Sequence, residues 1–213
     1  MDKEEYKYQK EVNIKALRND REYEVRRRVL KEVADVFEKE KVDWALSCSS
    51  QLFLNGVVDD FHDFDILIGG YTVGEMKKAL EKIGAISRDI GDQTNFYSDN
   101  FFRYRLKEID LDMVSSFRIV IFDTVYCCDY YEFDIELSNI NGIGTIPLIP
   151  MEASYLLYGM MECWQPQRHH KRCLIEQYFE ECGIANPQIF ENVLEKYKLP
   201  GWLENNVKML LNL

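Results

Sequence analysis

Hydrophobic residues recur at helical spacing in residues 3–40, a segment that is otherwise highly charged. One face of this segment carries apolar side chains, at Val25, Val29, Val33, Val36 and Phe37. Such a stripe is typical of an amphipathic helix that packs on a core. Asn19-Asp20 interrupts the pattern, so the segment is predicted to form one helix or two helices that meet at this point.

The pattern then changes to short apolar runs separated by small or polar residues. Residues 42–46 predict a strand, and residues 47–50 form a turn of small residues. Ser49 is placed to cap a short helix over residues 51–55, and Gly56 would end that helix. A second strand is predicted over residues 64–68. Gly69-Gly70 end that strand, and Thr72 can cap a helix over residues 73–83.

The middle of the chain is rich in predicted strands. Alternation and β-branched or aromatic residues indicate strands over residues 86–89, 101–107, 109–115, 118–122, 124–128, 133–137 and 144–148. Asn141-Gly142, between the last two, is a hairpin turn signal. This part of the chain is therefore expected to complete a sheet.

After Pro150 the apolar period becomes helical again. Two stripes are clear, one including Met160, Met161 and Trp164 and the other ending at Cys182. Asn186-Pro187 indicates the start of a further helix, and Pro200-Gly201 separates a last short one. The expected fold class is α/β, with a sheet domain over residues 1–149 and a helical domain over residues 150–213.

Composition narrows the classes of partner. The formal net charge is −11, which argues against a dedicated nucleic-acid binder because such proteins neutralise phosphates with basic residues. The charged N-terminus lacks the apolar core of a signal peptide, and no apolar run approaches the ~20 residues of a membrane span. None of the 6 Cys forms a C-x-x-C pair, so a cytoplasmic protein with reduced thiols is expected. Nor does their spacing with His169 and His170 fit a compact zinc site.

Acidic residues on two predicted strands suggest chemistry. Asp63 and Asp65 occupy alternate positions and therefore point to one side of a strand. Asp112 lies on a later strand, where Asp110 shares its face and is the alternative third carboxylate. Hard cations such as Mg²⁺ take oxygen ligands of this kind, often together with phosphate. The cluster predicts a metal-dependent enzyme that acts on phosphate compounds.

The order of small-residue turn, short helix, D-x-D strand and later acidic strand resembles the polymerase-β-like nucleotidyltransferase superfamily. Within it, the chain is most similar to small bacterial enzymes that adenylylate lincosamides and aminoglycosides. The resemblance runs from Trp44 to about Tyr178. It rests on Trp44, Leu46, Ser49, Leu52, Leu54, Gly56, Asp63, Asp65, Asp112, Glu152, Tyr158 and Lys171.

The resemblance implies a mixed-sheet core and transfer of a nucleotide, AMP from ATP, to a hydroxyl of a small acceptor. Two Mg²⁺ ions would take part, bound by Asp63 and Asp65. Asp112 would complete the metal site or act as general base toward the acceptor. Neither the acceptor, the base of the nucleotide nor the oligomeric state follows from the pattern.

Three further positions would contact the nucleotide. Ser49 would bind a phosphate at the start of its helix, a role compatible with a plain helix cap. Arg168 and Lys171 share a helix face and would meet the triphosphate, unless they belong to an ordinary charged surface. Glu152 would orient the acceptor or, as the favoured interpretation, cap its own helix by charge.

One departure from the family pattern supports an alternative function. Cys48 stands where the family turn usually has glycine, which permits positive φ and a close approach of phosphate to the backbone. A side chain there would narrow the phosphate pocket. The alternative is therefore a degenerate member that binds a nucleotide or a protein without catalysis.

Overall fold

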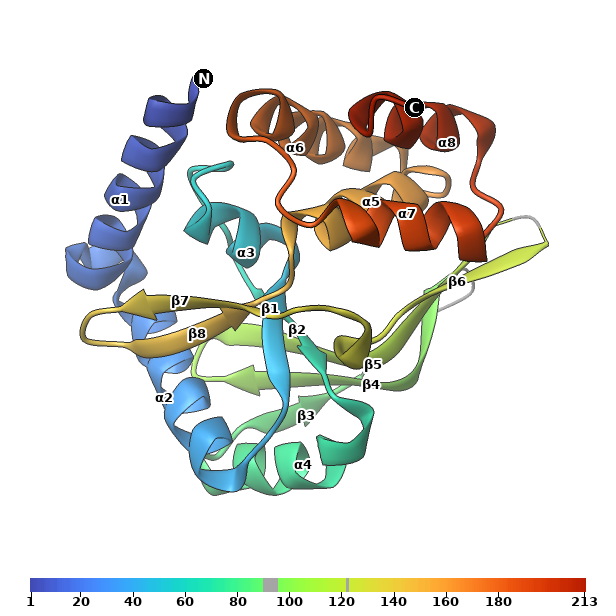
Figure 1. Ribbon diagram of the computed structural model, residues 1–213. Coiled ribbons are helices and arrows are strands. Elements are labelled where there is room, and N and C mark those ends of the chain that lie inside the picture. Colours follow the sequence, from blue (N-terminus) through green and yellow to red (C-terminus); the bar gives the residue numbers. More distant parts are fainter. Residues whose placement is uncertain (90–95, 122) are drawn as a thin grey trace.

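The computed structural model describes residues 1–89, 96–121 and 123–213. Its centre is a mixed sheet (Figure 1) with the strand order β3-β4-β5-β2-β1-β8-β7, in which β6 also pairs with β5. The described strands are β1 (Trp44–Ser47), β2 (Phe64–Ile68), β3 (Ile86–Arg88), β4 (Phe96–Leu106), β5 (Ile109–Ile121), β6 (Thr124–Cys128), β7 (Glu136–Ile140) and β8 (Gly144–Leu148). The predicted α/β class with a mixed sheet is thus confirmed.

Parallel pairings join strands that are far apart in the sequence. β1 runs antiparallel to β2, whereas β2 is parallel to β5 and β1 is parallel to β8. The two parallel pairs place segments from residues 44–68 beside segments from residues 109–148. This topology brings the D-x-D strand next to the later acidic strand.

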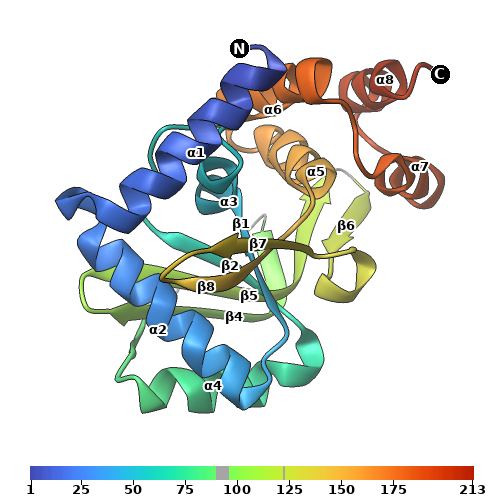
Figure 2. The ribbon, with the colours of Figure 1, turned by 60° about the vertical axis from the view of Figure 1, so that its left-hand side comes forward.

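Helices cover both faces of the sheet (Figures 1 and 2). They are α1 (Lys3–Asn19), α2 (Glu24–Glu40), α3 (Cys48–Leu54), α4 (Val73–Lys82), α5 (Met151–Glu162), α6 (His169–Cys182), α7 (Pro187–Lys196) and α8 (Gly201–Leu210). α2 and α4 pack on one face, in a cluster that contains Phe64, Ile66 and Leu111. The helices after residue 150 share a second cluster with Ala45 and Leu67. A domain boundary at residue 149 stays a prediction.

Several predicted boundaries are confirmed. α1 ends at a C-cap on Asp20, which separates it from α2. β2, β6 and β8 have the predicted bounds, and Pro187 occupies the first turn of α7. A turn at Asn141-Gly142 joins β7 to β8, and Gly142 has the positive φ of 85° that such turns require.

Other predictions need correction. The two predicted strands over residues 109–115 and 118–122 form one continuous strand, β5, and residue 122 lies outside the described residues. The strand predicted over residues 133–137 is displaced, because β7 occupies Glu136–Ile140. A 3₁₀ turn over Tyr130–Glu132 precedes it, where the Asp129 side chain accepts a hydrogen bond from the backbone N–H of Tyr131. Thr72 occupies the N-cap position of α4 but makes no side-chain capping bond, because its hydroxyl oxygen accepts from the backbone N–H of Asp43 and its proton goes to the Gly69 carbonyl.

Two further expectations concern disulfide bonds and membrane-spanning helices. All six cysteines lie within the described residues and none is in a disulfide. No helix in the described ranges is long and apolar enough to cross a membrane.

Gly56 allows α1 to pack closely against the end of α3. Its φ is 77°, and a Cβ at this position would lie 2.6 Å from the Lys10 nitrogen and the Tyr6 carbonyl oxygen. We expect Gly56→Ala to lower the free energy of unfolding by about 3 kcal/mol, from backbone strain together with overpacking. Gly84→Ala is the matched control, since Gly84 has a φ of 75° but nothing within 4 Å of its Cβ position. Urea unfolding should show a loss of only about 1 kcal/mol for that variant.

Candidate functional site

The sheet carries acidic residues toward the helices that follow residue 150. In β2, Phe64, Ile66 and Ile68 are buried on the α2–α4 side, so the alternate residue Asp65 points to the opposite face. β5 follows the same alternation, and its register places Asp112 directly beside Asp65. The structure therefore brings together two of the predicted carboxylates.

Asp63 lies close to this pair at the entry to β2. The pKa of the Asp65 carboxyl is raised to about 7, mainly by burial and also by the negative charges of Asp63 and Asp112, while Arg168 acts in the opposite direction. A carboxyl group in such surroundings lacks compensating positive charge. The three residues thus form the crowded acidic site that the sequence predicts, although their roles stay a prediction.

Arg103 holds Asp112 in place and was not anticipated from the sequence. It lies opposite Asp112 in the β4–β5 register, and its Nε and Nη2 atoms donate to the two carboxylate oxygens, each at 2.7 Å. This is the bidentate geometry of a strong charge-assisted pair. The alternation of Phe101, Arg103 and Arg105 along the predicted strand was the signal that could have placed a cation on this face.

Asp110 is separated from the site, although it lies on the same face of β5 as Asp112. Its carboxylate pairs with Arg105 at 3.7 Å, and its side chain is 46% exposed against 18% for Asp112. Of the two candidates for the third carboxylate, Asp112 is the one beside Asp65.

The turn between β1 and α3 lies beside the acidic pair. Ser47 precedes α3, and its hydroxyl donates to the Asp65 carbonyl oxygen at 3.0 Å. Helix α3 begins at Cys48, so the prediction that Ser49 caps a helix from residue 51 is wrong: Ser49 lies inside the first turn. The cause is local, because Cys48 adopts a φ of 52° and turns the chain into the helix three residues early.

Cys48 therefore takes the conformation that glycine adopts most easily. Its side chain points into the neighbourhood of Asp65, whose charge is among the influences on the Cys48 thiol. Burial raises the pKa of this thiol strongly, so Cys48 stays protonated at neutral pH. It is thus a packing residue with a positive φ rather than a nucleophile.

A cavity of about 250 Å³ opens between the acidic strands and helix α5. Its polar lining consists of Ser47, Asp65, Arg103, Asp112, Gln165 and Arg168. Its apolar lining consists of Leu67, Phe101, Val114, Phe117, Ile149, Leu157 and Met161, with Cys48 and Cys128. Both the sheet and the segments after residue 150 thus contribute to one site.

The two predicted cations of the C-terminal helices lie near the acidic pair. Arg168 lines the cavity, and its Nε donates to the Gln165 side chain at 2.9 Å. Lys171, one turn into α6, is half-buried; burial lowers the pKa of its ammonium group, and Asp65 and Asp63 act in the opposite direction. Among the described residues no acidic side chain forms an ion pair with either cation, which leaves both available for a ligand.

Within the described ranges, no three carboxylate, imidazole or thiol groups come close enough together to hold a metal ion. At this site Arg103 engages both oxygens of Asp112. Asp63 and Asp65 still fit a divalent cation, since the half-buried Asp65 lies amid negative charge that such an ion would neutralise.

Glu152 belongs to the scaffold rather than to the site. It is fully buried in the first turn of α5, where it accepts hydrogen bonds from the backbone N–H groups of Ala185 and Asn186 at 2.8 and 2.9 Å. Its place in the first turn agrees with the favoured interpretation of a charge at the start of its own helix, and its hydrogen bonds also fix the loop between α6 and α7. Trp164 differs from its predicted place in a core stripe, because α5 ends at Glu162 and the Trp164 ring is 44% exposed.

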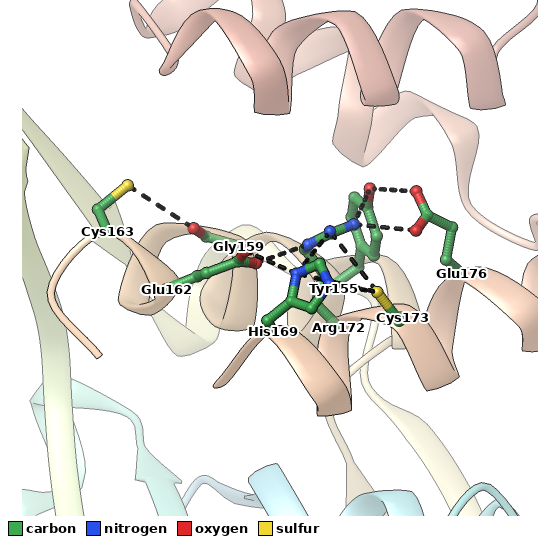
Figure 3. A network of polar contacts seen from close by, with 8 residues as sticks. All are labelled: Tyr155, Gly159, Glu162, Cys163, His169, Arg172, Cys173 and Glu176. Atoms are coloured by element: carbon green, nitrogen blue, oxygen red, sulfur yellow. Dashed lines mark hydrogen bonds and ion pairs between the residues drawn. The ribbon is translucent and has the colours of Figure 1, made fainter. Parts of the chain in front are cut away.

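A buried arginine ties α5 to α6 (Figure 3). Arg172 donates to Glu162 at 2.8 Å and to Glu176 at 2.9 Å. His169 and Cys173 lie at the edge of this network, 3.4 Å apart, and form no zinc site with the other described residues. The network keeps in position the helix that carries Lys171.

Comparisons with known proteins agree on the fold. No family model matches the sequence, and a search of curated proteins finds no match. Among solved structures, TM1012 from Thermotoga maritima, a protein provisionally named a nucleotidyltransferase, superposes with a TM-score of 0.52. It is 22% identical over 72% of this chain and 92% of that one.

A second similar structure is ANT(2'')-Ia in complex with adenylyl-2''-tobramycin. Its TM-score is 0.53 at 9% identity, over 88% of this chain and 98% of that one. The solution structure of the antibiotic-resistance factor ANT(2'')-Ia gives a TM-score of 0.52 at 13% identity, over 73% of this chain and 84% of that one. The protein therefore has a nucleotidyltransferase fold of the kind found in an antibiotic-modifying enzyme.

Proposed function

We propose that this protein is a metal-dependent nucleotidyltransferase that transfers AMP from ATP to a hydroxyl of a small molecule. The observation that carries the proposal is the pairing of Asp65 with Asp112 on adjacent parallel strands, at the wall of a cavity that Arg168 closes from the other side. Carboxylates on one wall and a guanidinium opposite suit a Mg²⁺–triphosphate complex.

The reaction is a displacement at the α-phosphorus. The acceptor oxygen forms a bond to that phosphorus, the bond from phosphorus to the α,β-bridging oxygen breaks, and pyrophosphate leaves with the electron pair. Asp112 accepts the hydroxyl proton of the acceptor as general base. This assignment uses the carboxylate that Arg103 already orients by two hydrogen bonds.

The other side chains bind and position the nucleotide. Asp63 and Asp65 would hold Mg²⁺, which when bound neutralises phosphate charge and polarises the reacting phosphoryl group. Arg168 and Lys171 bind the β- and γ-phosphates from the helical side, and Ser49 contributes its hydroxyl and backbone N–H from the first turn of α3. The half-buried position of Lys171 strengthens its interaction with phosphate because the local dielectric is low.

Metal removal and product analysis test the proposal. The protein is incubated with MgCl₂, α-³²P-labelled ATP and a panel of hydroxylated acceptors, and the products are separated and weighed by mass spectrometry. We expect one acceptor to gain the mass of AMP, with stoichiometric pyrophosphate, and EDTA to abolish the transfer. Absence of label transfer to every acceptor, together with Mg²⁺–ATP binding that Asp63→Ala leaves unchanged, would contradict the proposal.

A nucleotide-binding module without catalysis is the second candidate, and Cys48 favours it because a side chain occupies the phosphate turn. We expect Cys48→Gly to bind Mg²⁺–ATP more tightly, by about fivefold, since glycine adopts a φ of 52° without strain and opens the turn. Calorimetry on both forms measures the change. Transfer activity that appears only in Cys48→Gly would establish the second candidate for the natural chain, whereas activity in both forms would exclude it.

A further inference from the structure

We propose that the cavity beside Asp65 takes an acceptor that is uncharged around its reacting hydroxyl and carries an apolar face, and that Arg103 determines this preference. The inference rests on the proposed function and narrows its acceptor from any small hydroxylated molecule to one chemical class.

The apolar part of the acceptor is indicated by the apolar side chains that line the cavity beside the acidic pair and across from it on α5. Phe101 and Val114 line it from the sheet, while Leu157 and Met161 line it from α5. These side chains offer neither hydrogen-bond acceptors nor negative charge to an ammonium group. A polyamine placed against them would lose hydration without replacement, whereas an alkyl or aryl group would gain from burial.

The charges at the cavity wall also disfavour a cationic acceptor. Two guanidinium groups, of Arg103 and Arg168, line the cavity together with the carboxylates of Asp65 and Asp112. Each oxygen of Asp112 accepts one hydrogen bond from Arg103 and keeps a second lone pair for the acceptor hydroxyl, while the Arg103 charge compensates that of the carboxylate. Asp65 is assigned to the metal. An amino group near the reacting hydroxyl would therefore meet the Arg103 guanidinium at short range, beside a carboxylate whose charge is already compensated.

The net charge of −11 does not reverse this conclusion. Long-range attraction of cations by the whole surface is screened beyond about 8 Å at physiological ionic strength. Contacts within the cavity decide which ligand stays bound, and there the Arg103 charge is fixed. Its guanidinium lies 5.8 Å from the centre of the Phe101 ring and is held by the two 2.7 Å bonds to Asp112.

A similar structure was solved with an acceptor of a different kind. ANT(2'')-Ia was solved with adenylyl-2''-tobramycin, and tobramycin is a polyamine. The present cavity has the same kind of fold around it but a lining that suits a different acceptor. The fold alone does not determine the acceptor, which depends on side chains such as Arg103.

The test compares two ligands that differ only in charge. Octyl β-D-glucoside, below its critical micelle concentration, and the corresponding 2-amino-2-deoxyglucoside are titrated by calorimetry into the full-length protein in a buffer that contains MgCl₂. We expect the uncharged glycoside to bind at least about tenfold more tightly, because the ammonium group meets the guanidinium groups at short range. Failure of the uncharged glycoside to bind, or equal or tighter binding of the amine, would overturn the proposed class.

Variants of the strand then test Arg103 itself. In Arg103→Gln the carboxylate of Asp112 becomes free to pair with an amine, so the preference should fall to about twofold or reverse. Arg103→Lys retains the charge and should keep the preference. Arg105→Gln is the matched control on the same strand, because Arg105 pairs with Asp110 outside the cavity.

Circular dichroism spectra establish that each variant is folded, and should Arg103→Gln fail to fold, Arg103→Met replaces it as the variant that removes the charge. A shift of preference in Arg105→Gln as large as that in Arg103→Gln, or its loss in Arg103→Lys, would overturn the role of Arg103. These binding measurements need no catalysis. Selective binding without nucleotide transfer would therefore contradict the proposed function while leaving the ligand class intact.

Discussion

Replacing Asp65 with asparagine is expected to reduce nucleotide transfer by roughly 10³-fold, corresponding to about 4 kcal/mol of transition-state stabilisation. The physical reason is that asparagine keeps the shape of the side chain but removes the charge that would hold the metal beside the phosphates. Initial rates of AMP transfer at saturating ATP and acceptor measure the effect.

The same substitution should leave the fold intact. Asp65 carries a buried charge close to Asp63 and Asp112, so its removal relieves repulsion in the protein without ligands. We expect the melting temperature of Asp65→Asn to equal or exceed that of the original protein. Asp110→Asn is the matched control, since that residue pairs with Arg105 away from the cavity, and its transfer rate should change less than about threefold. Comparable losses in both variants would show that the assignment of Asp65 is wrong.

Replacing Arg172 with methionine is expected to lower the free energy of unfolding by about 3 kcal/mol. The Arg172 side chain is only 5% exposed and bridges Glu162 and Glu176, whose side chains are 18% and 27% exposed. Without the guanidinium, two partly buried carboxylates face each other with no cation between them. Urea denaturation followed by circular dichroism measures the loss.

An exposed ion pair supplies the control for this prediction. Arg28 and Glu24 form an i, i+4 pair on α2, with side chains that are 63% and 37% exposed. Arg28→Met should therefore cost about 0.5 kcal/mol or less, because water solvates both groups once the pair is broken. A similar small loss in Arg172→Met would mean that Glu162 and Glu176 reach solvent after the substitution, and that the network does not secure α6.

The acidic residues on the strands could be predicted because their direction depends on residues next to them in the sequence. Alternation fixes the direction of Asp65, and the apolar residues Phe64, Ile66 and Ile68 fix which face of the strand is buried. The distinction between Asp112 and Asp110 could not be made in this way, because both lie on one face of β5. It follows from position along the strand: Asp112 lies beside Asp65, whereas Asp110 lies beyond the paired part of β2.

The gaps and errors in prediction arise where distant groups compete with local ones. Glu152 was interpreted through its own helix alone, yet its partners are the N–H groups of Ala185 and Asn186, more than thirty residues away. Arg103 was missed because its role depends on the pairing of β4 with β5. Ser49 was interpreted as the cap of α3, although the N-cap is Ser47, because only the structure reveals the positive φ of Cys48.

The pairing of β1 with β8 has a consequence for how the chain folds. Leu46 lies beside Leu148 in the sheet, and the backbone N–H of Ile149 donates to the Leu46 carbonyl oxygen at 3.0 Å. During synthesis, β1 therefore leaves the ribosome about a hundred residues before the strand that covers its free edge. Closing such a long loop is slow, and until then the nascent chain exposes one unpaired edge of β1 near the carboxylates of the proposed site.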